Sequence, residues 1–341
     1  MVLGFAPLML WEGFSLFYYG FPFPNTAYAK LNTGIPTMAL VVQGIHYLEL
    51  SFTLDPLALL LITASAISAL AIKDGGASRF NSPPVLGIIL YVAYVVKIGG
   101  DFMSGRFLTA PFFIAVILIS RAPFNMLDRR TCRICFMLVI LAGLASPVPT
   151  IFTGPGVGAK EVTKGFHRAY GIKDERASYY EVTGFLRSFG GGPWPDFPWT
   201  RDGDRLRAQG GGVEIAYAIG YLGFHAGPSV HIIDENALAD PLLARIKIVG
   251  GPRNARRVFY LGTSDIVIGH FKRDIPAGYR ETLLTGENKL DDPNLAAYYE
   301  ILSFITRGPL FDLRRCKEIA RMNLGHYDHY LEAYLNCGDP G

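Results

Sequence analysis

A short polar segment, residues 97–106, lies between two hydrophobic runs and combines residue types that can bind a ligand. It reads Lys-Ile-Gly-Gly-Asp-Phe-Met-Ser-Gly-Arg, with cations at Lys97 and Arg106 and a carboxylate at Asp101. Ionisable groups at membrane depth are costly and are functional by default, and glycines let the backbone approach a ligand closely. The segment therefore predicts a binding site. The alternative is a hairpin tip whose cations reach the aqueous interface.

Other patterns favour plain structural interpretations. Gly154–Gly158 resembles a nucleotide loop, but no strand precedes it. Asp202-Gly-Asp204 has the form of a metal–nucleotide site, but it falls in a Gly/Pro-rich stretch, 190–212, which predicts a loop with local ion pairs. His326-x-x-His329 has metal-like spacing without a third ligand nearby. The sequence therefore predicts no metal site.

The four cysteines form two pairs. Cys132-x-x-Cys135 lies in a hydrophobic run, and two cysteines alone cannot complete a zinc site, so we interpret them as packing residues. Cys316 and Cys337 lie in the polar C-terminal part and are a candidate disulfide.

The elements that position these residues fall into two parts of different composition. The chain of 341 residues is 50% hydrophobic and 18% charged, but residues 1–150 contain only nine Lys/Arg and six Asp/Glu. This predicts a transmembrane helical bundle over 1–150 and an α/β domain over 151–341, with the boundary near 147–155. The net charge of +3 is too small to predict a nucleic-acid partner.

Five hydrophobic segments are candidate membrane helices, since about 20 apolar residues cross the hydrocarbon core. These segments are residues 2–20, 54–72, 83–98, 107–120 and 132–149. The alternative is that some are core helices of a soluble protein. Arginines and lysines in the loops 73–82 and 121–133 place those loops on the cytoplasmic side. Residues 151–341 would then be extracytoplasmic.

Two further regions have distinct patterns. Residues 21–53 combine a Pro-rich, aromatic loop with an amphipathic helix over 37–53, which predicts an interfacial segment. In the C-terminal part, residues 166–188 are helical in pattern, 213–219 and 230–234 are predicted strands, and 293–334 are mostly helical. Strands that alternate with helices indicate a small α/β layer.

Several motifs recur in an order that resembles a known family. They are Tyr18-Tyr19-Gly20, Pro24-Asn25-Thr26-Ala27-Tyr28-Ala29-Lys30, Gly99–Arg106, Gly171-Ile172-Lys173-Asp174-Glu175-Arg176, Ile232-Ile233-Asp234, Leu238–Leu242 and Ile268–Arg273. Together they resemble the C-terminal part of the terminal β-1,2-arabinofuranosyltransferase family of membrane enzymes. They also resemble proteobacterial relatives of that family labelled flagellar motor control proteins.

The resemblance implies a partial GT-C type fold in the bacterial inner membrane. It implies a glycosyltransferase that moves a sugar, arabinofuranose being one candidate, from a polyprenyl-phosphate donor to a cell-envelope glycan on the outer face. The family is expected to invert the anomeric centre with a carboxylate base from an early Asp pair, which this sequence lacks. The resemblance therefore implies a fragment, half of a split gene whose N-terminal half is a partner, or an incorrect start.

The resemblance also implies roles for individual residues. Arg106, Lys97 and Lys30 are candidate ligands of the donor phosphate, and Asn25 and Thr26 are candidates for the sugar hydroxyls. Asp101 would orient Arg106, bind the sugar or, as a further alternative, serve as the base.

Four more residues are candidates for the rim of the C-terminal domain. Asp174, Glu175 and Arg176 would cover the cavity, the alternative being a charged helix start. Asp234 is a site candidate by its position at a strand end, and a capping role is equally consistent with that position.

Other classes of function stay open. The main alternative is a non-enzymatic envelope or flagellar motor control protein that keeps the fold without the chemistry. A transporter fragment is a weaker alternative, because the sequence has no inverted repeat.

Overall fold

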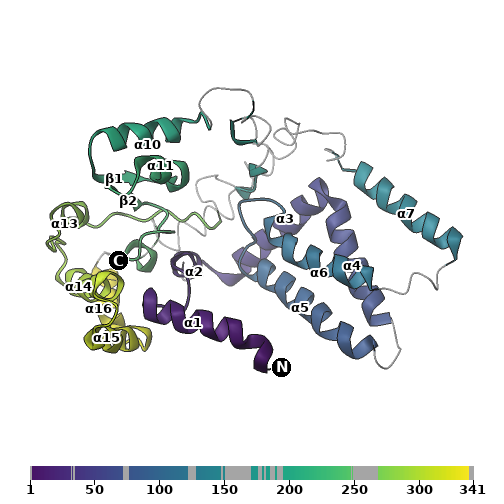
Figure 1. Cartoon of the computed structure of the whole chain (residues 1–341), viewed down its shortest axis with the longest axis horizontal. Helices are drawn as coiled ribbons and strands as arrows, with labels where there is room; N and C mark the ends of the chain where they lie inside the picture. The colour runs from purple at the N-terminus through teal and green to yellow at the C-terminus, as the bar shows by residue number, and fades with distance from the viewer. Residues whose placement is uncertain are drawn as a thin grey trace. The chain divides into compact units, whose positions relative to one another are not determined.

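The chain forms two compact units in the computed structural model (Figure 1). The structure describes residues 2–31, 33, 35–71, 77–121, 128–146, 149, 170–175, 179, 182–184, 189, 195–246, 248 and 268–337. The first unit, called the α/β unit, comprises Met1–Gly34, Asp196–Gly251 and His270–Gly341. The second, called the helical unit, comprises Ile35–Pro195 and Pro252–Gly269. Residues 1–34 thus group with the C-terminal segments, whereas the sequence predicted one N-terminal part up to residue 150.

The α/β unit contains a two-stranded parallel sheet, β1 (Gly212–Ala216) and β2 (Val230–Asp234), linked through α11 (Ile219–Ala226). Gly212 pairs with Val230 and Ala216 with Asp234. The predicted strands over 213–219 and 230–234 are confirmed within a few residues at their ends. The other helices of this unit are α1 (Ala6–Tyr18), α2 (Asn25–Leu31), α10 (Pro198–Ala208), α13 (Tyr279–Thr285), α14 (Pro293–Arg307), α15 (Leu313–Asn323) and α16 (Asp328–Cys337), with 3-10 turns at Val2–Phe5 and Leu243–Arg245.

The predicted loop over 190–212 was wrong for residues 198–208, which form α10. Proline at the first position of a helix is favourable because its missing N–H has no partner there in any case, and the next run of glycines begins only at Gly210. Gly203 lets α10 pack closely on α11, because a Cβ there would come within 2.6 Å of the Leu222 carbonyl oxygen. Asp202 and Asp204 therefore lie on a helix and not in a turn.

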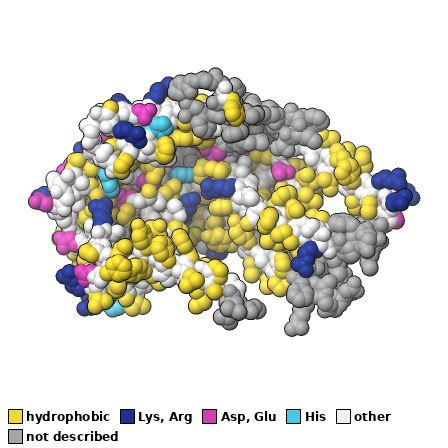
Figure 2. Space-filling model, viewed as in Figure 1, with side chains coloured by type: hydrophobic (Ala, Val, Ile, Leu, Met, Phe, Trp, Pro, Cys, Tyr) yellow, Lys and Arg dark blue, Asp and Glu magenta, His cyan; other side chains and the backbone are white. Residues whose placement is uncertain are grey.

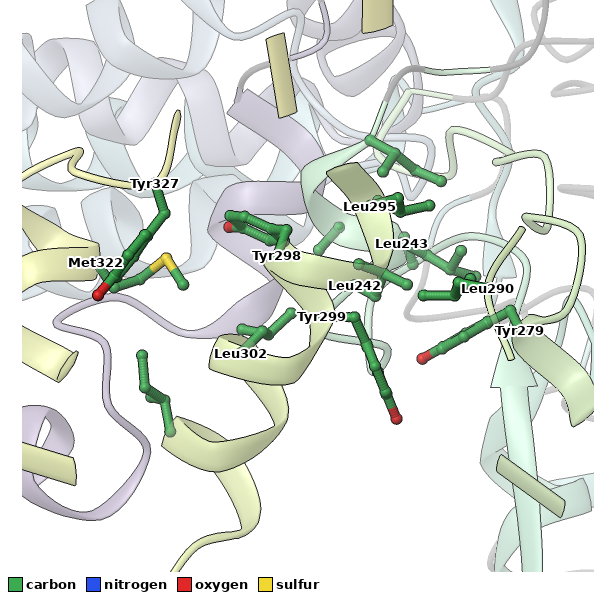
Figure 3. Close-up of a cluster of buried hydrophobic side chains, with 14 of the residues drawn as sticks. Leu242, Leu243, Tyr279, Leu290, Leu295, Tyr298, Tyr299, Leu302, Met322 and Tyr327 are labelled. Carbon is green, nitrogen blue, oxygen red and sulfur yellow. The ribbon is translucent and has the colours of Figure 1, made fainter. Parts of the chain in front are cut away.

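Helix α14 forms the centre of the core of the α/β unit (Figure 3). It begins at Pro293, and the side chain of Asp292 accepts a hydrogen bond from the Leu295 N–H at 2.8 Å, the geometry of an N-cap. Its buried residues recur at helical spacing and face Leu242, Leu243 and Tyr279; they are Leu295, Tyr298, Tyr299, Leu302 and Ile305. The predicted helical character of residues 293–334 is confirmed by α14, α15 and most of α16.

The helical unit contains α3 (Thr37–Leu54), α4 (Pro56–Ala71), α5 (Ala77–Lys97), α6 (Thr109–Ser120) and α7 (Arg129–Leu144), with a 3-10 turn at Arg106–Leu108. Its core is built from α4, α5 and α6, where Ile62, Val85, Ile88, Ala115 and Leu118 pack together. Helices α4, α5, α6 and α7 agree with four of the five predicted apolar segments, and α1 of the α/β unit agrees with the fifth, residues 2–20. Most of the predicted helix over 166–188 lies outside the described residues.

Among the described helices, none alone has both the length and the apolar composition needed to cross a membrane. The helices Thr37–Leu54 and Pro56–Ala69 meet that test as a pair, with a bend of 107° between them. The five-span bundle stays a prediction.

Candidate functional site

The predicted segment 97–106 forms a tight turn that only glycines allow. Gly99, Gly100 and Gly105 have φ of 87°, 69° and 74°, which side chains rarely adopt. Gly100 ends α5 by donating its N–H to the Val95 carbonyl at 2.8 Å. A Cβ on Gly100 would overlap the ring of Tyr47 on α3. Tyr47 also fixes the other end of the turn, since its hydroxyl accepts the Phe107 N–H at 3.1 Å.

This turn, residues 99–106, is paired with the segment 170–175. The Lys173 N–H donates to the Phe102 carbonyl at 2.8 Å, and the Ser104 N–H donates to the Lys173 carbonyl at 3.0 Å. Segment 170–175 is also bound to α3, because the Gln43 amide donates to the Tyr170 carbonyl at 2.6 Å. Two motifs that lie about 70 residues apart in the sequence therefore form one structure.

Two ion pairs lie on these paired segments. The Arg106 Nη2 is 2.6 Å from Asp101 Oδ2, and the Lys173 Nζ is 2.7 Å from Glu175 Oε1. In each pair the carboxylate is the buried partner: the side chain of Asp101 is 1% exposed and that of Arg106 is 41% exposed. The Arg106 guanidinium also lies 5.3 Å from the centre of the Phe107 ring. A buried carboxylate therefore holds each of the two cations in position. Cations held in this way are suited to bind an oxyanion.

The structure brings together some of the predicted site residues and adds one. Asp101, Arg106 and Glu175 meet at the paired segments, and Lys97 is exposed at the end of α5. Asp174 is half-buried beside them in the chain. Lys173 was missed, although its place inside the Gly171–Glu175 motif was a signal that could have found it. Arg176 lies outside the described residues.

The side chain of Asn25, which was predicted to bind sugar hydroxyls, makes hydrogen bonds within the α/β unit. Its amide nitrogen donates to the carbonyls of Ala237 and Asp240, each at 3.0 Å, and its Oδ1 accepts from Arg245 Nη1 at 3.2 Å. The Arg245 guanidinium lies 4.1 Å from the centre of the Phe21 ring. Asn25 thus anchors the start of α2 to the turn after β2.

The other candidates in the α/β unit differ in exposure. Thr26 is exposed on α2, and Lys30 is half-buried near its end. Asp234 is 1% exposed and accepts the N–H groups of Asn236 and Ala239, each at 3.0 Å. Burial raises the pKa of Asp234 above its ordinary value. Its contacts are those of the capping role.

Asp240 occupies a similar position in the turn that follows. Its Oδ1 accepts the N–H groups of Leu242 and Leu243, each at 2.9 Å, and its Oδ2 accepts the Tyr279 hydroxyl at 2.9 Å. Burial raises the pKa of Asp240 as well.

The described residues include three of the four cysteines with their side chains, and they bear on the disulfide and metal predictions. Cys316 is exposed as a free thiol, and the side chain of Cys337 lies outside the described residues, so their disulfide stays a prediction. Cys132 is half-buried and Cys135 exposed. Within the described part of the chain, no three His, Cys, Asp or Glu side chains are grouped so that they could hold a metal ion.

The chain is similar to parts of two curated proteins with the same name. It is 30% identical over 226 residues to the terminal beta-(1->2)-arabinofuranosyltransferase of Mycobacterium tuberculosis, covering 57% of this chain and 34% of that protein. It is 33% identical over 132 residues to the protein of that name from Corynebacterium glutamicum, covering 34% of this chain and 18% of that protein. The chain therefore spans about a third of the first relative and less than a fifth of the second. No family model and no solved structure matches it.

Proposed function

We propose that the chain is part of a membrane glycosyltransferase of GT-C type. It transfers a sugar, with arabinofuranose as the first candidate, from a polyprenyl-phosphate donor to a cell-envelope glycan at the outer face of the bacterial inner membrane. The partial similarity to two arabinofuranosyltransferases supports the reaction class. The observation that carries the proposal is the pair of cations, Arg106 and Lys173, each backed by a buried carboxylate.

These cations would act on the leaving group. As the acceptor hydroxyl attacks the anomeric carbon, the bond between sugar and phosphate breaks and negative charge grows on the phosphate. Fixed cations stabilise developing charge better than mobile ones, because they need no reorganisation during the reaction. Asp101 is then a positioning residue for Arg106. Its burial and its ion pair disfavour a role as the base, so the proton of the acceptor would go to a carboxylate elsewhere in the enzyme.

The test is sugar transfer by the full-length protein in membranes supplied with labelled polyprenyl-phosphate arabinose. We expect Arg106→Ala to lower transfer by about 100-fold, the usual scale for loss of one group that stabilises transition-state charge. Lys289→Ala, which removes a half-exposed lysine paired with Glu287, is the matched control and should keep full transfer.

A second variant separates activity from folding. Arg106→Ala leaves the Asp101 carboxylate buried without its cation, which destabilises the protein. The double variant Asp101→Asn with Arg106→Ala removes that charge and should recover stability without recovering transfer. Full transfer by a stably expressed double variant would refute the proposed role of Arg106.

A second candidate is a non-enzymatic envelope or flagellar motor control protein. It is favoured by the carboxylates of Asp101, Glu175 and Asp234, all of which are buried and bonded within the protein. Under this alternative the full-length protein would bind a lipid phosphate and transfer no sugar.

A further inference from the structure

Helix α7 is attached to the helical unit at one end only in the described residues. After its last turn, the Ser146 hydroxyl donates to the Leu54 carbonyl at 2.6 Å, and Leu57 lies against Gly143. From Arg129 to Leu144, none of its residues is buried. The exposed side chains are large and apolar, with Phe136 66% exposed and Leu138 58% exposed. Such a surface is unstable in water unless something apolar covers it.

The other end of α7 is basic. Arg129, Arg130 and Arg133 are all exposed there, and Figure 2 shows dark-blue side chains at the tip of this helix with apolar side chains along the rest. The acid next to them, Asp128, is already used as the N-cap, since it accepts the Thr131 N–H at 2.7 Å. Three arginines against one carboxylate leave this end of α7 with a net positive charge.

One face of α7 combines these two properties. Residues that recur every three or four positions line a shallow, open depression on the surface; they are Arg130, Arg133, Ile134, Met137 and Leu138. This spacing places them on one side of a helix. Two guanidinium groups therefore lie at one end of this depression, and its other described lining residues are apolar, which matches the charged head and apolar tail of a lipid.

We propose that this face binds an anionic phospholipid of the bilayer. The lipid phosphate sits between Arg130 and Arg133, and an acyl chain follows Ile134, Met137 and Leu138. Guanidinium groups bind phosphate through paired hydrogen bonds. The apolar stretch from Ile134 to Leu144 is about 16 Å long at 1.5 Å per residue, about half of a 30 Å hydrocarbon core. The helix therefore enters one leaflet, with its arginines at the headgroups.

A second copy of the chain fits this face less well. A symmetric contact along α7 would bring like-charged arginine clusters toward one another or leave them on an apolar surface, and both arrangements are unfavourable. The proposed site is distinct from the paired segments that carry Arg106 and Lys173, and it does not rest on sugar transfer.

The test measures lipid retained by the full chain purified in neutral detergent, using native mass spectrometry with phosphatidylglycerol or phosphatidylcholine added. We expect phosphatidylglycerol to be retained about tenfold better, because phosphatidylcholine carries the same phosphate but adds a choline cation that the two arginines repel. Arg130→Gln with Arg133→Gln should abolish this preference. Arg201→Gln with Arg205→Gln removes the same charge from exposed positions on α10 and should leave the preference intact.

Two further arms complete the design. Met137→Gln with Leu138→Gln should weaken retention of both lipids, because it removes the apolar wall. Arg106→Ala should leave the preference unchanged, which separates this site from the proposed transferase site. Equal retention of the two lipids by the unchanged chain would overturn the proposal. So would phosphatidylglycerol bound normally after loss of both arginines, competition by inorganic phosphate alone, or a lipid-free dimer that buries α7.

Discussion

At the scale of single residues, buried carboxylates serve two different purposes in this protein. Asp101 and Glu175 each form an ion pair with a more exposed cation and fix the position of that cation. Asp234 and Asp240 instead accept backbone N–H groups and shape the turns after β2. Asp101 and Glu175 can therefore influence ligand binding through the cations that they position. Asp234 and Asp240 stabilise the fold.

The raised pKa of Asp240 predicts how the α/β unit responds to pH. The folded state binds the proton of this carboxyl more tightly than the unfolded state, so its contribution to the free energy of unfolding is largest at low pH. That contribution falls as pH rises from the ordinary pKa toward the raised one. Asp240→Asn keeps an oxygen for Leu242 and Leu243, so we expect it to remove this pH dependence and to raise the free energy of unfolding at pH 7.

The measurement is denaturant unfolding of the chain and of the variant at pH 5 and pH 7. Asp312→Asn is the control without a pH slope in this range, because hydrogen bonds that Arg314 donates hold the pKa of the Asp312 carboxyl below its ordinary value. Stability from Asp312 is present above its ordinary pKa and is lost only as pH falls through the lowered one. An identical pH slope for Asp240→Asn and the unchanged chain would contradict the prediction.

At the scale of elements, the turn over 99–106 depends on glycine for two separable reasons. Gly100 and Gly105 both have positive φ, but only Gly100 faces a neighbouring side chain, the ring of Tyr47. Gly105 has no atom within 4 Å of the position that a Cβ would occupy. The two glycines therefore form a matched pair that separates backbone strain from steric overlap.

We expect Gly105→Ala to cost about 1 kcal/mol, the penalty of a left-handed conformation alone. Gly100→Ala should cost several times more, because Tyr47 and the turn cannot both keep their places. The displaced turn should then also lose the pairing with Lys173. Thermal unfolding gives the two costs, and hydrogen exchange at Phe102–Ser104 reports the pairing. Equal costs for the two variants would show that Tyr47 does not fix the turn.

The sequence predicted elements well where their signals are local. The alternating apolar residues of β1 and the helical spacing in α14 were sufficient, whereas α10 was missed because Gly203 and the prolines suggested a loop. The pairing of Lys173 with Phe102 was not predicted, since no local pattern encodes a contact across about 70 residues. For the same reason Asn25 was interpreted as a ligand residue, although its partners lie more than 200 residues away.

At the scale of the whole molecule, buried arginines tie the first 34 residues to the C-terminal segments of the α/β unit. Arg315 is fully buried and donates to the carbonyls of Phe17 and Tyr18, at 2.6 and 2.8 Å, where α1 ends. Arg273 is 1% exposed and donates to the Ala29 carbonyl at 2.9 Å. Burial lowers the pKa of Arg273 to about 10, which leaves it charged at neutral pH. Residues 1–34 thus supply part of the carbonyl acceptors of both cations, and Ile246, Phe271 and Ile305 supply the others.

Removal of residues 1–34 should therefore unfold the α/β unit selectively. The deletion leaves Arg273 and Arg315 buried without several acceptors, a cost of several kcal/mol, and uncovers the core around α14. We expect hydrogen exchange in α14 and α15 to rise to the level of unfolded peptides, while α5 and α6 keep their protection.

Arg315→Gln is the point variant, with exposed Arg314→Gln as its neighbour control. It should raise exchange at the end of α1 and around Ile305 at the end of α14, because the carbonyls there lose the donor that Arg315 supplies. Unchanged protection of α14 in the shortened chain would mean that the C-terminal segments fold without the N-terminal helices, and that the buried arginines find other partners.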